Sequence, residues 1–276
     1  MFPDMSLLLM GYQLDYYIYD MNFRKKKLFS LLEEYGEYKN SLSVKTSENW
    51  TSYTHQYTNL ICRRSNDGEK VYLNIYSEHP DFNYLENTNN YLERCYHILE
   101  LDINKEKTSK MYARGYPPVY SSNSKNYVIF SAINFDIDNE NCFYVSYEAD
   151  SLIYKYDSQY NPLYSFGYSG TDMNMNFKKI NNYEDCRKYF RQERMDKGYY
   201  SWVEYIDETE LLFRSYTKGN HNLHDGLQIY SGSLLLADLS VPKGLKVVGY
   251  VAPYYYSQAI AEEEEELLLV YRFKLD

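Results

Sequence analysis

The sequence predicts an all-β fold, a β-propeller built from four-stranded antiparallel blades. Two observations lead to this prediction. Tyrosine is unusually frequent, with 36 residues in a chain of 276, and tyrosine favours strands, where its ring packs and its hydroxyl reaches water. A short apolar strand that ends in Asp, followed by a polar turn and a second apolar strand, also recurs along the chain. Such repetition of short strands is typical of propellers.

The repeated unit occurs four times, and its Asp residues are Asp20, Asp102, Asp157 and Asp238. Each copy is interpreted as a hairpin, because alternating apolar residues suit a half-buried strand and the polar residues after it favour a turn. Further strands precede the later copies, within residues 71–76, 128–147 and 201–213. Two successive hairpins supply the four strands of one blade.

The repeats are spaced more widely than the roughly 40–45 residues of a common blade, so insertions are expected. One insertion, near residues 182–198, predicts a short helix. Asn182 can cap it, Glu184 and Asp185 lie in its first turn, and Gly198 can end it. A mixed α+β domain is the alternative fold. The regular strand–helix alternation of a parallel sheet is missing, however, which favours the propeller.

The C-terminal segment allows two interpretations. Residues 259–266 have high helix propensity, whereas residues 267–273 form an apolar run that fits a buried strand. We expect an acidic turn that leads into a final strand.

Composition restricts the class of partner. The length of 276 residues and a hydrophobic fraction of 44% fit a single globular domain, residues 1–276. Asp and Glu outnumber Lys and Arg by 39 to 29, giving a net charge of −10. This excess argues against nucleic acid and anionic membrane surfaces, although a local basic patch would escape the count. No apolar run approaches the roughly 20 residues of a membrane helix, so we predict no transmembrane segment.

The four cysteines are dispersed and form no Cys-x-x-Cys pair; they are Cys62, Cys95, Cys142 and Cys186. This spacing does not fit a zinc knuckle or a thioredoxin-type motif. Free cysteine behaves as a small apolar residue, so we expect buried free thiols.

Two segments have some features of a metal site. His221, His224 and Asp225 are close in sequence, but glycines flank them as in an exposed loop. Residues 136–140 alternate acidic side chains like a calcium loop, yet Asn141 stands where that loop needs glycine. A hairpin turn explains the pattern. We therefore predict no metal ion and no cofactor.

Candidate binding residues lie near the ends of two apolar segments, 211–218 and 250–256. Arginine and tyrosine are enriched where proteins bind partners, and stacked tyrosine rings also suit sugars and peptides. The predicted binding residues are Arg214, Tyr216, Tyr254, Tyr255 and Tyr256. The alternative is that these tyrosines fill strand positions in the core.

No catalytic motif is found: the sequence has no phosphate-binding loop, no nucleophile elbow and no His-Glu-x-x-His helix. The carboxylates of Glu148 and Asp150 fit a turn between two strands. We therefore predict no catalytic residue.

Two parts of the sequence resemble blades of the TolB-like six-bladed β-propeller family. The first is residues 134–167, with the strands 143–148 and 152–157. The second is residues 212–257, with the turn 241–244. The resemblance is good from about residue 96 to residue 273. It implies a six-bladed envelope lipoprotein of Gram-negative bacteria, from a family of unknown function, and it brings no catalytic residue with it.

Proteins of that family begin with a lipoprotein signal and further blades. The first residues of this sequence match neither, because the apolar run at residues 6–10 is too short for a signal. We therefore expect an N-terminally truncated form of a longer exported protein, with an incomplete propeller.

The functional prediction is a non-catalytic binding or scaffold module of the cell envelope, located in the periplasm or on the outer membrane, with a protein or glycan as its ligand. The alternative is a propeller enzyme, a hydrolase or lyase acting on glycans, with its site in the central funnel. The fold hosts both classes and does not choose between them.

Overall fold

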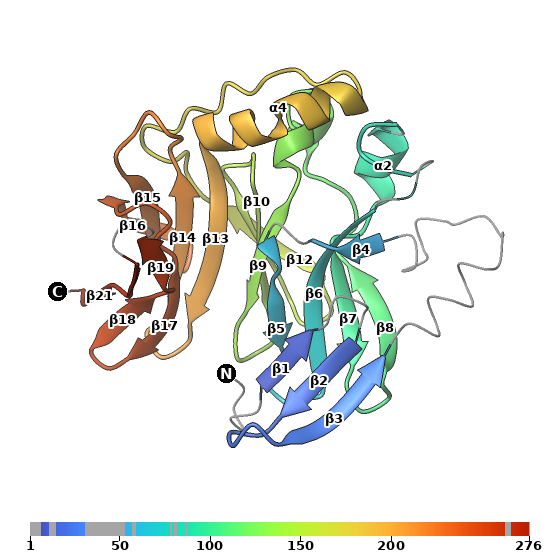
Figure 1. Ribbon diagram of the computed structural model, residues 1–276, viewed down its shortest axis with the longest axis vertical. Helices are drawn as coiled ribbons and strands as arrows, with labels where there is room; N and C mark the ends of the chain where they lie inside the picture. Colours follow the sequence, from blue (N-terminus) through green and yellow to red (C-terminus); the bar gives the residue numbers. More distant parts are fainter. Residues whose placement is uncertain are drawn as a thin grey trace. The chain divides into compact units, whose positions relative to one another are not determined.

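The computed structural model describes residues 7–10, 15–30, 53–56, 59–77, 79, 82–86, 88–262 and 266–275. The chain divides into two compact units, residues 1–116 (unit 1) and residues 117–276 (unit 2), and each unit is described by itself. The described strands form small antiparallel sheets, which are blades of a β-propeller (Figure 1). The predicted fold class is confirmed.

Unit 1 contains two blade sheets. The first has the order β1-β2-β3, with β1 (Leu7–Met10), β2 (Asp15–Tyr19) and β3 (Lys25–Ser30). The second is built around β6 and contains β4 (Tyr53–His55), β5 (Cys62–Arg64), β6 (Lys70–Ser77), β7 (Ile98–Asp102) and β8 (Lys107–Tyr112). Strands β4 and β5 pair with different parts of β6, so that together they act as one interrupted strand.

The core of unit 1 lies around β6, whose residues 71–75 are all buried. The short helix α2 (Thr88–Arg94) adds Tyr91 and Leu92 to this core. The ring of Tyr91 makes an edge contact with Phe82 at 5.1 Å between centroids, and Tyr84 contacts Tyr91 and Tyr116 in the same way. Edge-to-face packing of this kind contributes beyond burial alone, so the frequent tyrosines help to form the core.

Unit 2 contains three blade sheets. The strands of the first are β9 (Ile133–Ile137), β10 (Phe143–Tyr147), β11 (Ile153–Tyr156) and β12 (Pro162–Phe166). The second contains β13 (Tyr199–Ile206), β14 (Leu211–Thr217), β15 (Asp225–Ser231) and β16 (Leu234–Val241). The third contains β17 (Val247–Val251), β18 (Tyr254–Ser257) and β21 (Arg272–Phe273). A separate hairpin joins β19 (Ile260–Glu262) to β20 (Leu267–Leu269).

The cores of unit 2 lie between successive sheets. One cluster packs Tyr144, Ile153 and Phe166 against Val203, Leu212 and Tyr230, and so joins the first sheet to the second. A second cluster joins the second sheet to the third and includes Phe213, Ile229, Val247 and Tyr255. Because β9 neighbours β13 and β13 neighbours β17, these three strands are the adjacent inner strands of the three blades.

The predicted helical insertion is present as α4 (Tyr183–Asp196). The side chain of Asn182 caps it by accepting a hydrogen bond from the backbone N–H of Asp185, at 2.9 Å. Two shorter helical segments precede β9, α3 (Pro118–Ser122) and the 3-10 helix η3 (Val128–Phe130). Within unit 2, Figure 1 shows α4 lying across the ends of β10 and β13.

The first three repeat copies are hairpins, β2–β3, β7–β8 and β11–β12. The fourth prediction is wrong. The two apolar segments after residue 233 are β16 and β17, which belong to different sheets, and β16 pairs with β15 instead. The described residues form five blade sheets, so the six blades implied by the TolB-like resemblance are not confirmed. The acidic turn expected before the last strand falls partly on residues 263–265, which lie outside the described residues.

Candidate functional site

The inner strands of unit 2 begin close together, and Glu148 links two of them. The backbone N–H of Glu148 donates to the carbonyl of Ala132, just before β9, at 3.0 Å. Its carbonyl accepts from the N–H of Tyr200 in β13, also at 3.0 Å. The side chain of Asn134 adds a bond to the Tyr200 carbonyl at 3.0 Å. The turn that the sequence predicts at residues 147–151 therefore ties two blades together.

The Glu148 carboxylate is buried and pairs with Arg194 of α4. The two guanidinium nitrogens donate to its two oxygens at 2.7 and 2.9 Å, and one of them also reaches the Ile129 carbonyl at 3.2 Å. The guanidinium lies over the ring of Tyr199, 4.2 Å from its centroid. Burial alone would lower the pKa of Arg194, but the Glu148 carboxylate raises it. This bidentate pair fastens α4 to the ends of the inner strands.

Lys246 lies next to this pair, directly before the third inner strand. Its side chain is half-buried, and its ammonium stands 5.1 Å from the ring centroid of Trp202. Within the described part of the chain the ammonium has no hydrogen bond or ion pair. Burial lowers the pKa of Lys246; the Glu148 carboxylate opposes that shift and the Arg194 cation adds to it. Lys246 is thus a partly desolvated cation, and no carboxylate in the described ranges pairs with it.

Trp202 is held firmly beside Lys246. A bulge in the β13–β14 pairing falls between Tyr200 and Trp202. The indole N–H donates to the Val247 carbonyl at 2.9 Å and to the Glu204 carboxylate at 3.1 Å. The ring itself is half-buried. A fixed indole beside an ammonium suits a ligand that has both a negative charge and a ring or apolar face.

The predicted binding residue Arg214 lies in β14 and is completely buried. Its guanidinium donates to Gln228, to the hydroxyl of Tyr230, and to the carbonyls of Ser151 and Tyr168. These bonds are between 2.6 and 3.1 Å long. The guanidinium also lies 3.9 Å from the ring centroid of Tyr200. Arg214 therefore joins two blades from the inside.

The predicted tyrosines are divided between two sheets. Tyr216 is buried in β14 and donates to Asp238 at 2.6 Å. Tyr255 is buried in β18, in the core cluster that also contains Phe213. Tyr254 and Tyr256 are half-buried. The structure therefore brings Arg214 and Tyr216 into one sheet but does not gather all five residues on one surface, and their role in binding stays a prediction.

Sequence reasoning missed Lys246 and Trp202. A weak signal was available, since Trp202 is one of only two tryptophans in the chain. The contact between the two residues could not be inferred, because they are 44 positions apart in the sequence and belong to different blades.

The two metal-like motifs lie in turns of unit 2, and an Asp in each of them accepts backbone hydrogen bonds. His221 and His224 are exposed in the turn between β14 and β15. Asp225 accepts hydrogen bonds from the backbone N–H groups of Lys218 and Gly244, at 3.4 and 2.8 Å. In the β9–β10 turn, Asp138 accepts from the N–H groups of residues 140 and 142. Among the described residues, no three His, Cys, Asp or Glu side chains converge as metal ligands do.

All four cysteines are free, but only Cys95 and Cys142 are buried. Cys186 is half-buried and Cys62 is exposed, so the expectation of buried thiols is correct for two of the four. Cys95 Sγ lies 3.5 Å from the Nε2 atom of His97. Burial raises the pKa of this thiol far above its ordinary value, which disfavours the nucleophilic thiolate.

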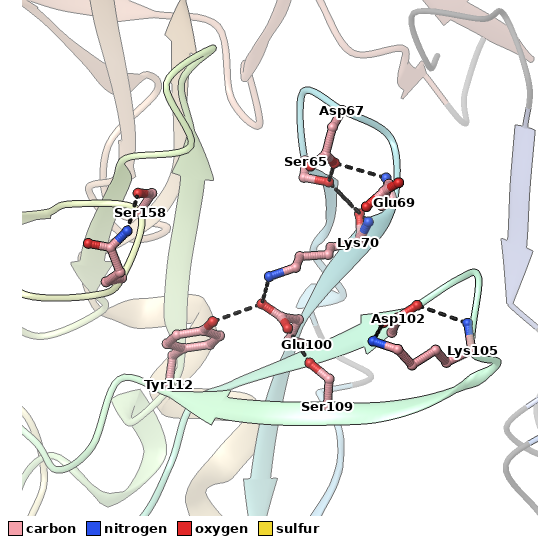
Figure 2. Close-up of polar contacts among 11 residues, drawn as sticks. Ser65, Asp67, Glu69, Lys70, Glu100, Asp102, Lys105, Ser109, Tyr112 and Ser158 are labelled. Carbon is pink, nitrogen blue, oxygen red and sulfur yellow. Dashed lines mark hydrogen bonds and ion pairs between the residues drawn. The ribbon is translucent and has the colours of Figure 1, made fainter.

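Unit 1 has a polar centre of its own at Glu100, a buried residue of β7 (Figure 2). Its carboxylate accepts from Lys70 at 3.1 Å, from the hydroxyl of Tyr112 at 2.8 Å, and from Ser109. Burial and the Glu100 charge raise the pKa of Tyr112. Since these partners lie on β6 and β8, Glu100 fastens three strands of one blade.

The fold and this site together define a β-propeller protein with a cation, at the inner strands of unit 2, that has no ion-pair partner among the described residues. No family model matches the sequence, and no curated protein matches it either. Among solved structures the chain is similar to a member of the DUF4221 family from Bacteroides vulgatus. The TM-score is 0.63 at 9% sequence identity, over 99% of this chain and 76% of that one. This similarity shows the fold alone.

Two further structures from the same genus are similar at lower scores. One is a protein of unknown function from Bacteroides caccae, with a TM-score of 0.43, 9% identity, and coverage of 91% of this chain and 66% of that one. The other is a candidate exported protein from Bacteroides fragilis, with a TM-score of 0.45, 12% identity, and coverage of 92% and 63%. No helix in the described ranges is long and apolar enough to span a membrane.

Proposed function

We propose that the protein is a non-catalytic binding module of the cell envelope that holds an anionic ligand at Lys246 and Trp202. The observation that carries the proposal is the Lys246 ammonium, which is partly desolvated beside an indole ring and has no counter-ion among the described residues. Burying a charge without a partner costs stability. Functional sites commonly retain residues that lower the stability of the fold in this way.

The neighbouring charges favour binding over catalysis. The Glu148 carboxylate is engaged by both nitrogens of Arg194, and Glu204 accepts from the indole of Trp202. The carboxylates of Glu148 and Glu204 therefore each already have a partner that holds them in place. An acidic glycan or a peptide carboxylate fits the combination, because it places a negative charge on Lys246 and a sugar or side-chain face on the indole. The envelope location in this proposal rests on the TolB-like resemblance of the blades.

A binding screen of the full chain tests this proposal. Acidic glycans and carboxylate peptides would be titrated while tryptophan fluorescence and heat release are recorded. For a ligand that binds, Lys246→Met should weaken the affinity by roughly ten- to a hundredfold, the value of a hydrogen bond to a charged group. Lys243→Met is the matched control, because Lys243 is an exposed lysine of the adjacent turn.

Stability gives a second readout of the same variant. Replacing Lys246 by Met removes an unpaired half-buried charge and retains the apolar stem, so the melting temperature should stay constant or rise. A clear loss of stability would show that the ammonium supports the fold. Cleavage of a glycan by the chain in the same screen would contradict a non-catalytic role.

A further inference from the structure

The segment around α4 differs in charge from the rest of the chain. Residues 178–197 contain seven Lys and Arg residues but four Asp and Glu residues, a net charge of +3 in a chain with a net charge of −10. A local patch of this kind is hidden by the total charge, and it can direct the chain toward an anionic surface.

Most of the acidic residues of this segment accept hydrogen bonds from neighbouring groups. Glu193 is buried and accepts from the backbone N–H of Lys178 at 2.8 Å. Asp185 accepts from the N–H of Asn181 at 3.1 Å, and Asp196 accepts from Gln192. Of the four acidic residues, only Glu184 has an exposed side chain. The positive charges therefore dominate the surface of this segment.

Five of the seven basic residues are exposed, and those on α4 alternate with apolar ones. Arg187, Lys188 and Arg191 are exposed on α4, while Lys178 and Lys179 are exposed in the segment before it. On the same helix, Tyr183 is 64% exposed, Met195 44% and Phe190 37%. Positions 183, 187, 190 and 191 follow the i, i+4, i+7, i+8 spacing of one helix face. Arg194 continues this side of α4 toward its C-terminal end, where the guanidinium lies near the Phe190 ring and donates to the Ile129 carbonyl of η3. The exposed part of the face therefore runs from Tyr183 to Arg191.

The positive charge of this segment is concentrated around Tyr189. The ammonium of Lys178 lies 3.6 Å from its ring centroid and that of Lys188 lies 4.9 Å away. A hydrogen bond from Lys188 and the charges of both lysines lower the pKa of this phenol. Two lysines gathered at one ring support a concentrated positive field.

We propose that this face of α4 binds the surface of an anionic lipid bilayer. Arginine and lysine attract acidic headgroups, at about 1 kcal/mol per residue near the surface. Exposed Tyr, Phe and Met side chains fit the boundary between headgroups and acyl chains, where amphipathic helices lie in the membrane plane. An acidic protein or a nucleic acid would match the charge, but it would leave three large apolar side chains without a function. The proposal concerns a surface separate from Lys246 and does not depend on the proposed ligand.

The test is co-sedimentation of the full chain with vesicles. Vesicles of phosphatidylcholine mixed with phosphatidylglycerol should bind the chain, vesicles of phosphatidylcholine alone should not, and added salt should weaken binding. The double variant R187E/R191E should lower binding at least about tenfold. Tyr183→Ser should lower it several-fold with the charge unchanged. Both substitutions are at exposed positions, and unchanged melting temperatures would verify the fold.

Two controls decide the outcome. K107E/K110E makes the same change in net charge at exposed positions of β8 in unit 1 and should leave binding intact. Heparin and duplex DNA should bind weakly and without dependence on Tyr183. Equal binding to neutral vesicles, no effect of R187E/R191E, or loss of binding in the β8 variant would overturn the proposal. So would polyanion binding as strong as lipid binding.

Discussion

At the residue scale, several tyrosines and an arginine form hydrogen bonds in the interior of this protein, although both residue types are common at protein surfaces. The hydroxyl of Tyr120 donates to the Phe130 carbonyl at 2.8 Å and accepts from the Ala149 N–H at 3.0 Å. The hydroxyl of Tyr200 donates to the Tyr168 carbonyl at 3.1 Å. A sequence rich in tyrosine predicts half-buried strands whose tyrosine hydroxyls bind water. In the structure, several of these hydroxyls form hydrogen bonds with backbone groups instead.

The first prediction concerns the contribution of Arg214 to stability. Replacing it with Met removes a fully buried cation together with its hydrogen bonds to Gln228 and to the carbonyls of Ser151 and Tyr168. We expect the free energy of unfolding to fall by about 3 kcal/mol or more. Urea unfolding followed by fluorescence measures it. Arg187→Met, at an exposed arginine of α4, is the control and should change it by less than about 0.5 kcal/mol.

The same experiment bears on the predicted binding role of Arg214. If the Met variant were as stable as the unchanged chain, the guanidinium would not be needed for the fold, and a functional role would gain support. A large loss of stability, without any effect on ligand affinity in the surviving folded fraction, would assign Arg214 to the fold.

At the element scale, local signals were sufficient for α4 and for most hairpins. Asn182, the acidic first turn and Gly198 predicted where the helix begins and ends, and α4 begins and ends close to these residues. The fourth repeat failed for a physical reason. A turn between two apolar strands has the same local chemistry whether it joins strands of one sheet or leads to the next sheet. Here β16 pairs with the preceding strand β15 across the two-residue turn at 232–233 and is the last strand of its sheet, whereas β17 begins the next sheet.

The helix cap gives the element-scale prediction. Asn182→Ala removes the side-chain acceptor for the Asp185 N–H and should cost about 1 kcal/mol of stability. Amide exchange at the start of α4 should accelerate, because the first turn loses its cap. Asn182→Asp should restore most of the loss, since aspartate caps equally well. Failure of Asp to rescue would contradict the capping role.

At the scale of the whole molecule, two buried histidines contribute to the response of stability to acid. Burial lowers the pKa of His55 to about 4 and that of His97 to about 3, whereas an unfolded histidine titrates near 6.5. Below that value the unfolded chain binds protons that the folded chain does not. The contribution of these two histidines to stability is therefore complete above about pH 6.5 and declines as the pH falls toward their folded pKa values.

Between about pH 7.5 and about pH 5.5 we expect each histidine to cost about 1.3 kcal/mol of stability. Urea unfolding at the two pH values measures the total, and His55→Gln or His97→Gln should each remove about half of the pH effect. His221→Gln, at an exposed histidine of the β14–β15 turn, should leave it unchanged. A pH-independent stability over this interval would show that neither imidazole is buried in its neutral form.

The amino-acid sequence by itself determined the all-β propeller class, most hairpins and the α4 insertion. These features depend on alternating apolar residues, turn residues and a cap, all of which act between near neighbours. Only the tertiary structure decided the number of blade sheets, the division of β16 from β17, the burial of Arg214 and the meeting of Lys246 with Trp202. The division of β16 from β17 depends on which sheet each strand joins. The other outcomes arise from pairing and packing between segments far apart in sequence, where the local pattern of each segment fits more than one partner.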